Sequence, residues 1–259
     1  MKKVILLVSL VFLVSLFFGC EENLDNILGS VTDGIELTDQ QQMDLVSLGL
    51  ADASGGIMSL LQIAGSSIDP SFYSLGKLDT SFTSDWVTYD ISFSFYSNNV
   101  EVPVFLPGVV DSVTCGIGMS GDHTFPSPSE NDAEWQVSLA AAAAFQVKQF
   151  TASDIRLHGS GVDTSHYVYS KNGVALNVEA NSNFLAENVV IPLNGENHVP
   201  VSGQLSGAAA GTASTGNLTK DFSIPYTAEF TGNDEIVVTL TNSGEQFTVN
   251  LLTGAVIKN

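Results

Sequence analysis

Alternation of apolar and polar residues is the feature that most limits how this 259-residue chain can fold. Apolar residues occupy every second position from Val87 to Phe95, from Phe222 to Phe230 and from Phe247 to Leu251. A period of two is the signature of a β-strand with one buried face. The sequence therefore predicts a mainly β fold over residues 67–259, either an antiparallel β-sandwich or a curved open sheet.

The stretch Glu134–Phe150 contains five consecutive alanines, Ala140 to Ala144, which favour a helix by intrinsic propensity. However, five large apolar residues on both sides of the alanines lie at odd positions: Trp135, Val137, Leu139, Phe145 and Val147. A helix would have no reason to preserve this phase. We therefore expect one long strand.

Two further stretches contain few large apolar residues. Residues 120–133 are rich in Gly, Ser, Pro and acids and predict a long exposed loop. Residues 202–217 consist almost entirely of Gly, Ala, Ser and Thr. This composition fits either a flexible loop or a strand whose small side chains let another element approach closely.

Residues 37–66 are the helical part of the chain. Thr38 and Gln41 have the spacing of a capping box, and leucines and isoleucines follow in two groups separated by Gly55-Gly56. Because glycine costs about 1 kcal/mol relative to alanine inside a helix, we expect two short helices, at residues 38–53 and 56–65. Their apolar faces should pack on one side or end of the sheet.

The N-terminus has the form of an export signal. Lys2 and Lys3 precede an apolar run from Val4 to Phe18, which ends at Gly19-Cys20 and is followed by acidic residues. A membrane-spanning helix needs about 20 apolar residues, and this run is shorter. The pattern predicts a signal peptide at residues 1–19.

The ending Phe17-Phe18-Gly19-Cys20 resembles the lipobox of bacterial lipoproteins. The resemblance implies cleavage before Cys20, acylation of that cysteine and a lipid anchor on the membrane. It covers the signal alone, and it departs from the family at Phe17 and Phe18, where leucine and then alanine or serine are preferred. An ordinary cleaved signal and an uncleaved anchor are the alternatives.

Residues 20–36 would then form an acidic tether between the lipid and the folded domain. In Gram-negative lipoproteins, a residue other than aspartate after the cysteine is associated with the outer membrane. Glu21 fits that pattern, so the resemblance implies a lipid-anchored protein of the cell envelope, at the outer membrane.

Charge restricts the partners. Removal of residues 1–19 takes away two lysines and no acids, which leaves 28 acidic and 6 basic residues and a formal charge of −22. Nucleic acids and anionic lipid headgroups both require basic surfaces, so neither is expected as a partner. The membrane contact would be the acyl anchor alone.

We find no sequence motif of a catalytic, nucleotide-binding or zinc site. Four residues of the predicted loop are metal-ligand types: Asp122, His123, Glu130 and Asp132. Calcium would be the ion most suited to such oxygen-rich groups, but the carboxylate spacing of an EF-hand is missing. We expect a solvated acidic loop, with no metal, cofactor or catalytic residue.

Cys115 and a group of aromatic residues are two other candidates for a functional site, and for both the alternative is a place in the core. Cys115 could act as a nucleophile, but its place in an alternating apolar series favours a small buried hydrophobe. Tyr167 and Tyr169, with Trp86 or Trp135, could form a sugar-stacking platform. Aromatic residues at alternating strand positions are more often part of the core.

These observations predict a membrane-anchored extracytoplasmic lipoprotein whose β domain has a non-enzymatic binding role, with a protein or glycan ligand, or a structural role in the envelope. One alternative is a carbohydrate-binding or hydrolytic surface lipoprotein that uses Asp122 and His123. Another is an outer-membrane β-barrel, because alternating strands of about ten residues recur in such proteins. The lipid signal and the helical region argue against the barrel.

Overall fold

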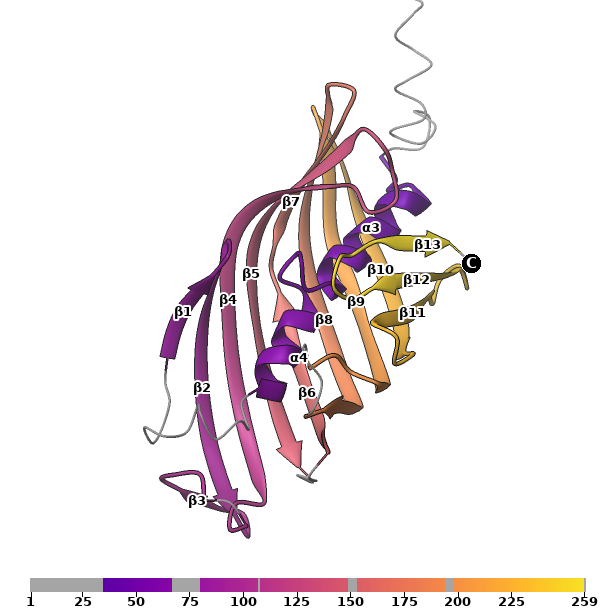
Figure 1. Ribbon diagram of the computed structural model, residues 1–259. Coiled ribbons are helices and arrows are strands. Elements are labelled where there is room, and N and C mark those ends of the chain that lie inside the picture. The colour runs from indigo at the N-terminus through magenta and orange to yellow at the C-terminus, as the bar shows by residue number, and fades with distance from the viewer. Residues whose placement is uncertain (1–34, 67–79, 107, 149–152, 194–197, 259) are drawn as a thin grey trace, which may run out of the picture.

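The computed structural model describes residues 35–66, 80–106, 108–148, 153–193 and 198–258. These residues form one strongly curved antiparallel sheet, with two helices on its concave side (Figure 1). The signal, Cys20 and the tether up to residue 34 lie outside the described residues. No described helix has the length and apolar character required to cross a membrane.

The helices are α3 (Asp39–Leu50) and α4 (Ile57–Ser66). The strands are β1 (Thr80–Ser84), β2 (Val87–Ser97), β3 (Val100–Val102), β4 (Ser112–Pro126), β5 (Ala133–Lys148), β6 (Asp154–Asp163), β7 (His166–Lys171), β8 (Val174–Pro192), β9 (Ser202–Thr215), β10 (Leu218–Phe230), β11 (Glu235–Leu240), β12 (Gln246–Asn250) and β13 (Val256–Lys258).

Strands that follow one another in the chain are neighbours in the sheet, in the order β1-β2-β4-β5-β6-β8-β9-β10-β11-β12-β13. Short β3 pairs with β2, and β7 continues the line of β6 between β5 and β8. The fold is thus mainly β, as predicted, and of the two predicted architectures it is the curved open sheet. Sequential antiparallel pairing explains why short turns suffice for most connections.

Strand β5 confirms the prediction made for the alanine stretch. Its burial alternates along its length, with Trp135 and Phe145 buried and Ala140, Ala142 and Ala144 exposed. We call the buried side, which faces the helices, the inner face of the sheet, and the opposite side the outer face. The preserved phase of the apolar residues outweighs the helix propensity of alanine because it buries one complete face.

The prediction of a loop over residues 120–133 is wrong for its first half. Strand β4 continues to Pro126 and stays in register with β5, with His123 opposite Val137. The propensity of Gly, Asp and Ser for loops is overridden here by pairing with a long neighbouring strand. Residues 202–217, for which the sequence left two alternatives, form strand β9 between β8 and β10.

The two predicted helices are confirmed. The Thr38 hydroxyl oxygen accepts a hydrogen bond from the Gln41 amide, and Gln41 Oε1 accepts one from the Thr38 amide, so the capping box is formed. Gly56 lies so close to the end of α3 that a Cβ there would be 2.7 Å from the Gly49 carbonyl oxygen. The glycine therefore permits the tight turn between the helices.

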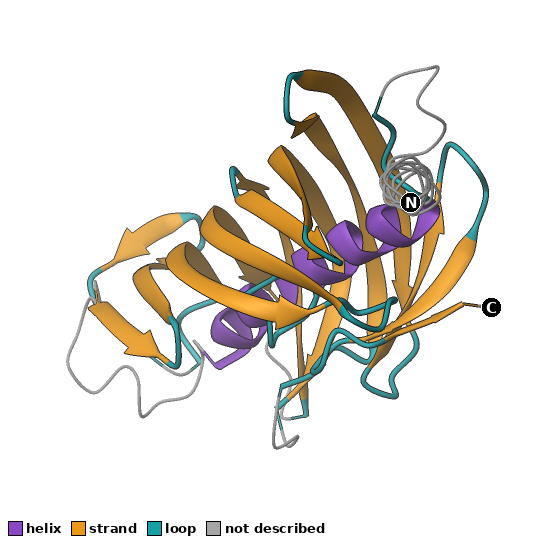
Figure 2. Ribbon diagram, turned by 90° about the horizontal axis from the view of Figure 1, so that it is seen from above, coloured by secondary structure: helices purple, strands orange, loops and turns teal. Residues whose placement is uncertain are grey.

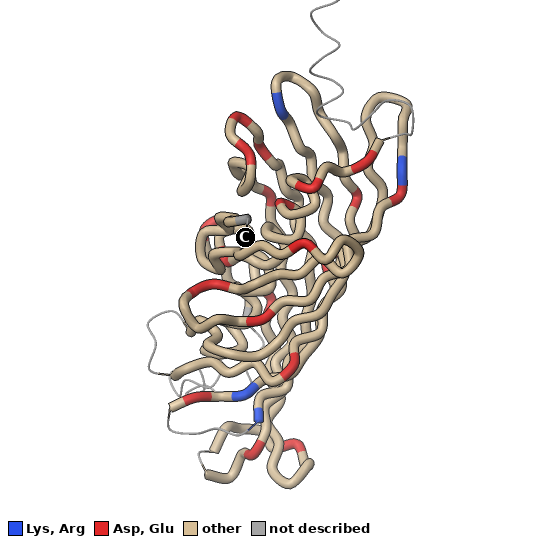
Figure 3. Tube along the Cα trace, turned by 90° about the vertical axis from the view of Figure 1, so that its right-hand side faces the viewer, with Lys and Arg blue, Asp and Glu red and all other residues tan. Residues whose placement is uncertain are grey.

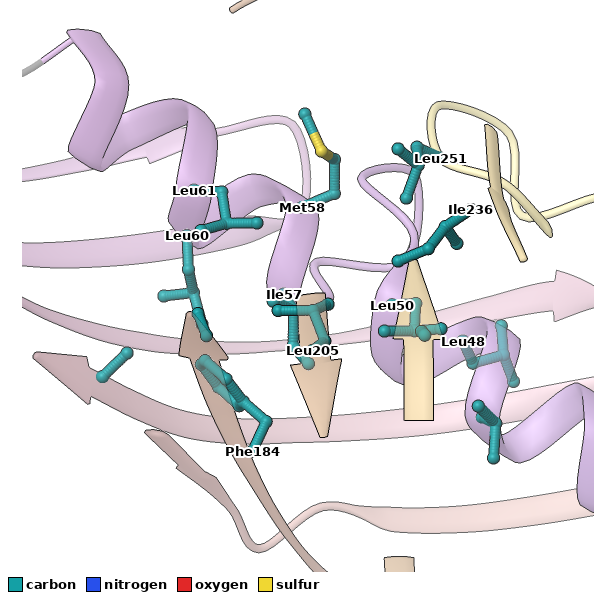
Figure 4. Packing of buried hydrophobic residues seen from close by; sticks show 14 of the residues in the cluster. Leu48, Leu50, Ile57, Met58, Leu60, Leu61, Phe184, Leu205, Ile236 and Leu251 are labelled. Carbon is teal, nitrogen blue, oxygen red and sulfur yellow. The ribbon is translucent and has the colours of Figure 1, made fainter. Parts of the chain in front are cut away.

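The helices lie in the trough of the curved sheet (Figure 2). The C-terminal strands fold over α3, where the Ser47 hydroxyl donates to the Gly254 carbonyl over 2.6 Å and the Asp52 amide donates to the Leu251 carbonyl. Leu60 of α4 points toward Phe184 of the sheet (Figure 4). One continuous apolar core joins the helices and the inner face, and the candidate site lies within it.

Candidate functional site

An enclosed cavity lies between the two helices and the middle of the inner face. Its walls are mostly apolar side chains and backbone of α3, α4 and the strands, and they include Leu45, Leu48, Leu60, Met119, Leu139 and Phe184. The volume in which the centre of a water molecule fits is about 30 Å³. Since one buried water needs roughly 10–15 Å³ of such space, the cavity can hold one or two waters in this conformation. We call it the Asp163 cavity, after the carboxylate in its wall.

Two glycines of the sheet lie under two of the rings that line the cavity, those of Phe184 and Tyr226. Gly161 and Gly207 flank Phe184 on its two neighbouring strands. A Cβ on Gly161 would lie 2.4 Å from Cε1 of Phe184, and a Cβ on Gly207 would lie 2.8 Å from the Tyr226 hydroxyl oxygen. Both rings therefore lie over glycine backbone on the sheet.

Asp163 supplies a carboxylate to the wall of this cavity. Its Oδ1 accepts hydrogen bonds from the Ser165 amide (2.8 Å) and the Ser165 hydroxyl, and its Oδ2 accepts one from the Tyr167 hydroxyl (3.1 Å). Burial raises the pKa of the Asp163 carboxyl above its ordinary value, while the hydrogen bonds from Ser165 and Tyr167 oppose the rise.

The local sequence explains why a carboxylate is placed inside. Asp163-Thr164-Ser165 interrupts the strand between β6 and β7, and the Asp163 side chain bonds the amide two residues later in an Asx turn. The break remains tied to its neighbours, because the Thr164 amide donates to the Ala140 carbonyl and the Ala180 amide donates to the Ser165 carbonyl. Asp163 thus takes an inward position where the strand bends.

Two more polar groups reach the cavity. Tyr226 is only 6% exposed, and within the described part of the chain its hydroxyl has no hydrogen-bond partner. Burial, and secondarily the charge of Asp163, raises the pKa of the Tyr226 hydroxyl. Ser182 also lines the cavity and lies opposite Asp163 in the pairing of β6 with β8.

A second buried carboxylate, Asp44 of α3, lies outside the lining of the Asp163 cavity. Asp44 is fully buried, and its Oδ2 accepts hydrogen bonds from Trp135 Nε1 (2.8 Å) and from the Ser127 hydroxyl, while its Oδ1 has no partner among the described residues. Burial raises the pKa of the Asp44 carboxyl, and the same hydrogen bonds oppose this.

The β4–β5 loop is attached to α3 through this carboxylate. Ser127 Oγ also accepts a hydrogen bond from the Glu130 amide (3.0 Å), and the Glu130 carboxylate accepts one from the Tyr169 hydroxyl. Lys171 Nζ lies 3.3 Å from Glu130 Oε1. We refer to Asp44, Ser127, Glu130, Trp135 and Tyr169 as the Asp44 cluster. Its contacts are all within the protein, and they indicate a structural role.

The four residues singled out as metal-ligand types do not come together. Asp122 and His123 are consecutive in β4, so their side chains lie on opposite faces: Asp122 accepts a hydrogen bond from Ser138, and His123 stacks on Trp86. Glu130 belongs to the Asp44 cluster and Asp132 is exposed. In the described ranges no group of three or more His, Cys, Asp or Glu could hold a metal ion.

The remaining sequence candidates belong to the core. Cys115 is buried, and burial raises the pKa of its thiol, so it behaves as the small hydrophobe that its position favoured. Trp135, Tyr167 and Tyr169 are also buried, which agrees with the core interpretation and removes them from a sugar-stacking platform. Trp86 is half-buried and packs on His123 and Phe125.

Asp163, Ser182 and Tyr226 were not singled out from the sequence. One signal for Asp163 was available, because it continues the odd, inward phase of Ile155 and Leu157, where an acid is out of place. Comparison with known protein families, with curated proteins and with solved structures finds no match.

Proposed function

We propose that this chain is a lipid-anchored lipoprotein of the cell envelope, at the outer membrane, whose β domain binds a small apolar molecule in the Asp163 cavity without chemically changing it. The observation that carries the binding role is the enclosed apolar cavity with a few polar groups at one end. Small-molecule sites commonly have this composition, and buried groups with shifted pKa values often mark them.

The position of the cavity also favours binding. It lies between the layer of helices and the sheet. A ligand larger than one or two waters therefore requires α3 or α4 to move away from the sheet, a displacement that leaves the pairing of strands intact. Asp122 and His123, the residues of the hydrolytic alternative, are exposed on opposite faces of β4 and are not among the residues that line it. The lining therefore suits recognition of apolar surface.

The anchor supplies the location in this proposal. Gly19-Cys20 at the end of an apolar signal is its basis. Intact-mass analysis and membrane fractionation of the wild type beside Cys20→Ala test it. We expect a mature wild-type chain that lacks residues 1–19, carries acyl chains and sediments with membranes, and a variant without acyl chains. An unmodified wild-type cysteine would contradict the anchor.

Methyl NMR tests the cavity as a binding site, with toluene as the probe. We expect toluene to shift the methyl signals of the lining residues Leu45, Leu60 and Met119 and to leave those of exposed Val100 and Ile257 unchanged. Ala141→Leu, which adds a side chain at the cavity wall, should weaken the effect. Shifts spread over both groups, or none at saturating toluene, would contradict binding in the cavity.

A further inference from the structure

The polar side chains that line the Asp163 cavity include those of Asp163, Tyr226 and Ser182, and no lysine, arginine or histidine lines it within the described residues. Oxygens on one side of an apolar space can accept hydrogen bonds from a donor-rich group. A carboxylate or phosphate on the ligand would have no cation to meet there, and an apolar ligand without a polar group would leave the buried oxygens unpaired.

Asp163 has capacity for one more hydrogen bond. A carboxylate offers about four lone-pair positions, and three of them receive the Ser165 amide, the Ser165 hydroxyl and the Tyr167 hydroxyl. Both bonds from Ser165 go to Oδ1, so the free position is on Oδ2, which accepts only from Tyr167.

Tyr226 is the independent observation that points to a ligand. Its side chain is buried and lines the same cavity, yet its hydroxyl has no hydrogen-bond partner in the part of the chain that the structure describes. A hydroxyl that makes no hydrogen bond within the protein can accept one from a bound donor. Ser182 adds a third oxygen beside Asp163.

Charge selects the kind of donor. Acidic residues greatly outnumber lysines and arginines over the chain, as Figure 3 shows for the described residues, and the formal charge is −20. The resulting field attracts cations and repels anions. Inside the cavity, a cation would compensate the charge of Asp163, whose ionised form burial disfavours. An ammonium group carries three N–H donors, so it can donate to more than one oxygen of the lining.

Resting on the proposed function, we infer that the ligand of the Asp163 cavity is a small apolar amine, with its ammonium group bound by Asp163 Oδ2 and the oxygens of Tyr226 and Ser182. The apolar part of the molecule would lie against the lining residues from α3 and α4, among them Leu45 and Leu60.

Three probes of similar size separate this inference from the proposed function: toluene, benzyl alcohol and benzylamine. Dissociation constants would be measured for each by NMR titration and calorimetry at pH 7. We expect benzylamine to bind at least ten times more tightly than toluene, with benzyl alcohol between them. Binding of none of the three would overturn the proposed function and the inference together. Toluene binding as tightly as benzylamine would overturn the inference and leave the proposed function in place.

Variants identify the groups that are responsible. Asp163→Asn should remove the preference for benzylamine and keep toluene binding within about twofold. Tyr226→Phe removes only a hydroxyl that makes no hydrogen bond in the described structure. It should weaken the binding of benzylamine severalfold and leave the binding of toluene unchanged, and it serves as the test if Asp163→Asn fails to fold.

The matched control is Glu187→Gln, at an exposed acid of β8 on the outer face. If Glu187→Gln reduces the preference as much as Tyr226→Phe does, the amine is bound by the general acidity of the protein, and the inference is wrong.

Discussion

Asp44 and Asp163 are two buried carboxylates in the same core, and their surroundings differ. Asp44 lies among large side chains: Trp135 and Tyr169 are almost fully buried, and the hydrogen bonds of Asp44 Oδ2 join α3 to the β4–β5 loop. Around Asp163 the inner face carries Gly161 and Gly207, and a cavity remains. Similar chemistry is thus used in one region to attach a loop and in the other to line an open space.

The difference shows how residue size decides what a buried polar group can do. At Asp44, which is packed against large aromatic residues, Oδ2 is paired within the protein and Oδ1 has no partner among the described residues. A carboxylate beside glycines and alanines keeps an unused acceptor position next to an unpaired tyrosine hydroxyl. The first arrangement contributes to stability, and the second retains a place for an external donor.

The largest effect should follow from truncating one of the large side chains beside Asp44. Trp135→Ala removes a fully buried side chain and the indole donor to Asp44. We expect it to lower the free energy of unfolding by about 3–5 kcal/mol, the usual cost of truncating a large buried aromatic residue. Urea denaturation followed by circular dichroism measures this. Phe82→Ala, at a ring that is 39% exposed, is the control and should cost under about 1 kcal/mol. Equal losses in the two variants would mean that Trp135 has no special role in the Asp44 cluster.

A methyl group added on the sheet, beneath a ring that lines the cavity, should also destabilise the protein. In Gly161→Ala the new methyl group would lie 2.4 Å from Cε1 of Phe184 and 2.8 Å from the Ala142 carbonyl oxygen. Because the second contact is with backbone, the ladder must shift, and we expect a loss of about 1–3 kcal/mol in the free energy of unfolding. An unchanged midpoint of urea denaturation would show that the cavity readily absorbs the displaced ring.

A methyl group added from the helix side should have the reverse effect. A Cβ on Gly49 of α3 would meet no atom within 4 Å, and Gly49 also lines the cavity. Gly49→Ala should therefore raise the free energy of unfolding by about 0.5–1 kcal/mol through helix propensity. Gly56→Ala, whose Cβ would meet backbone at 2.7 Å, is the matched control and should lower it. Stabilisation by both variants would contradict the described turn between the helices.

Most of the strands and both helices could be predicted from the sequence, because their buried residues recur at regular intervals. The inward phase of β5 could be read through five alanines, and the capping box placed the start of α3. Strand β9 and the second half of β4 could not be read, since small or polar residues there are held in the sheet by long neighbouring strands. The cavity depends on rings from one strand that lie over glycines of another. Such contacts arise from the register between strands, and no local pattern records them.

The smallest effect that separates the two regions is in the pH dependence of stability. Since burial raises the pKa of Asp44 in the folded state, the folded protein retains this proton at pH values where the unfolded chain, with an ordinary value near about 3.9, has lost it. The free energy of unfolding should fall as pH rises from that value to the raised folded pKa, and then level off. In Asp44→Asn this contribution is missing, so the wild type should lose stability relative to the variant over this window.

Asp163→Asn should show the same sign, because the pKa of Asp163 is raised as well. Bound benzylamine should favour the ionised carboxylate of Asp163 in the wild type. It should therefore reduce the pH-dependent difference in the free energy of unfolding between the wild type and Asp163→Asn. The corresponding difference between the wild type and Asp44→Asn should stay unchanged. Urea denaturation between pH 3 and pH 8 with and without the amine measures both differences, and an equal response of the two would contradict the distinction between an attached loop and an open site.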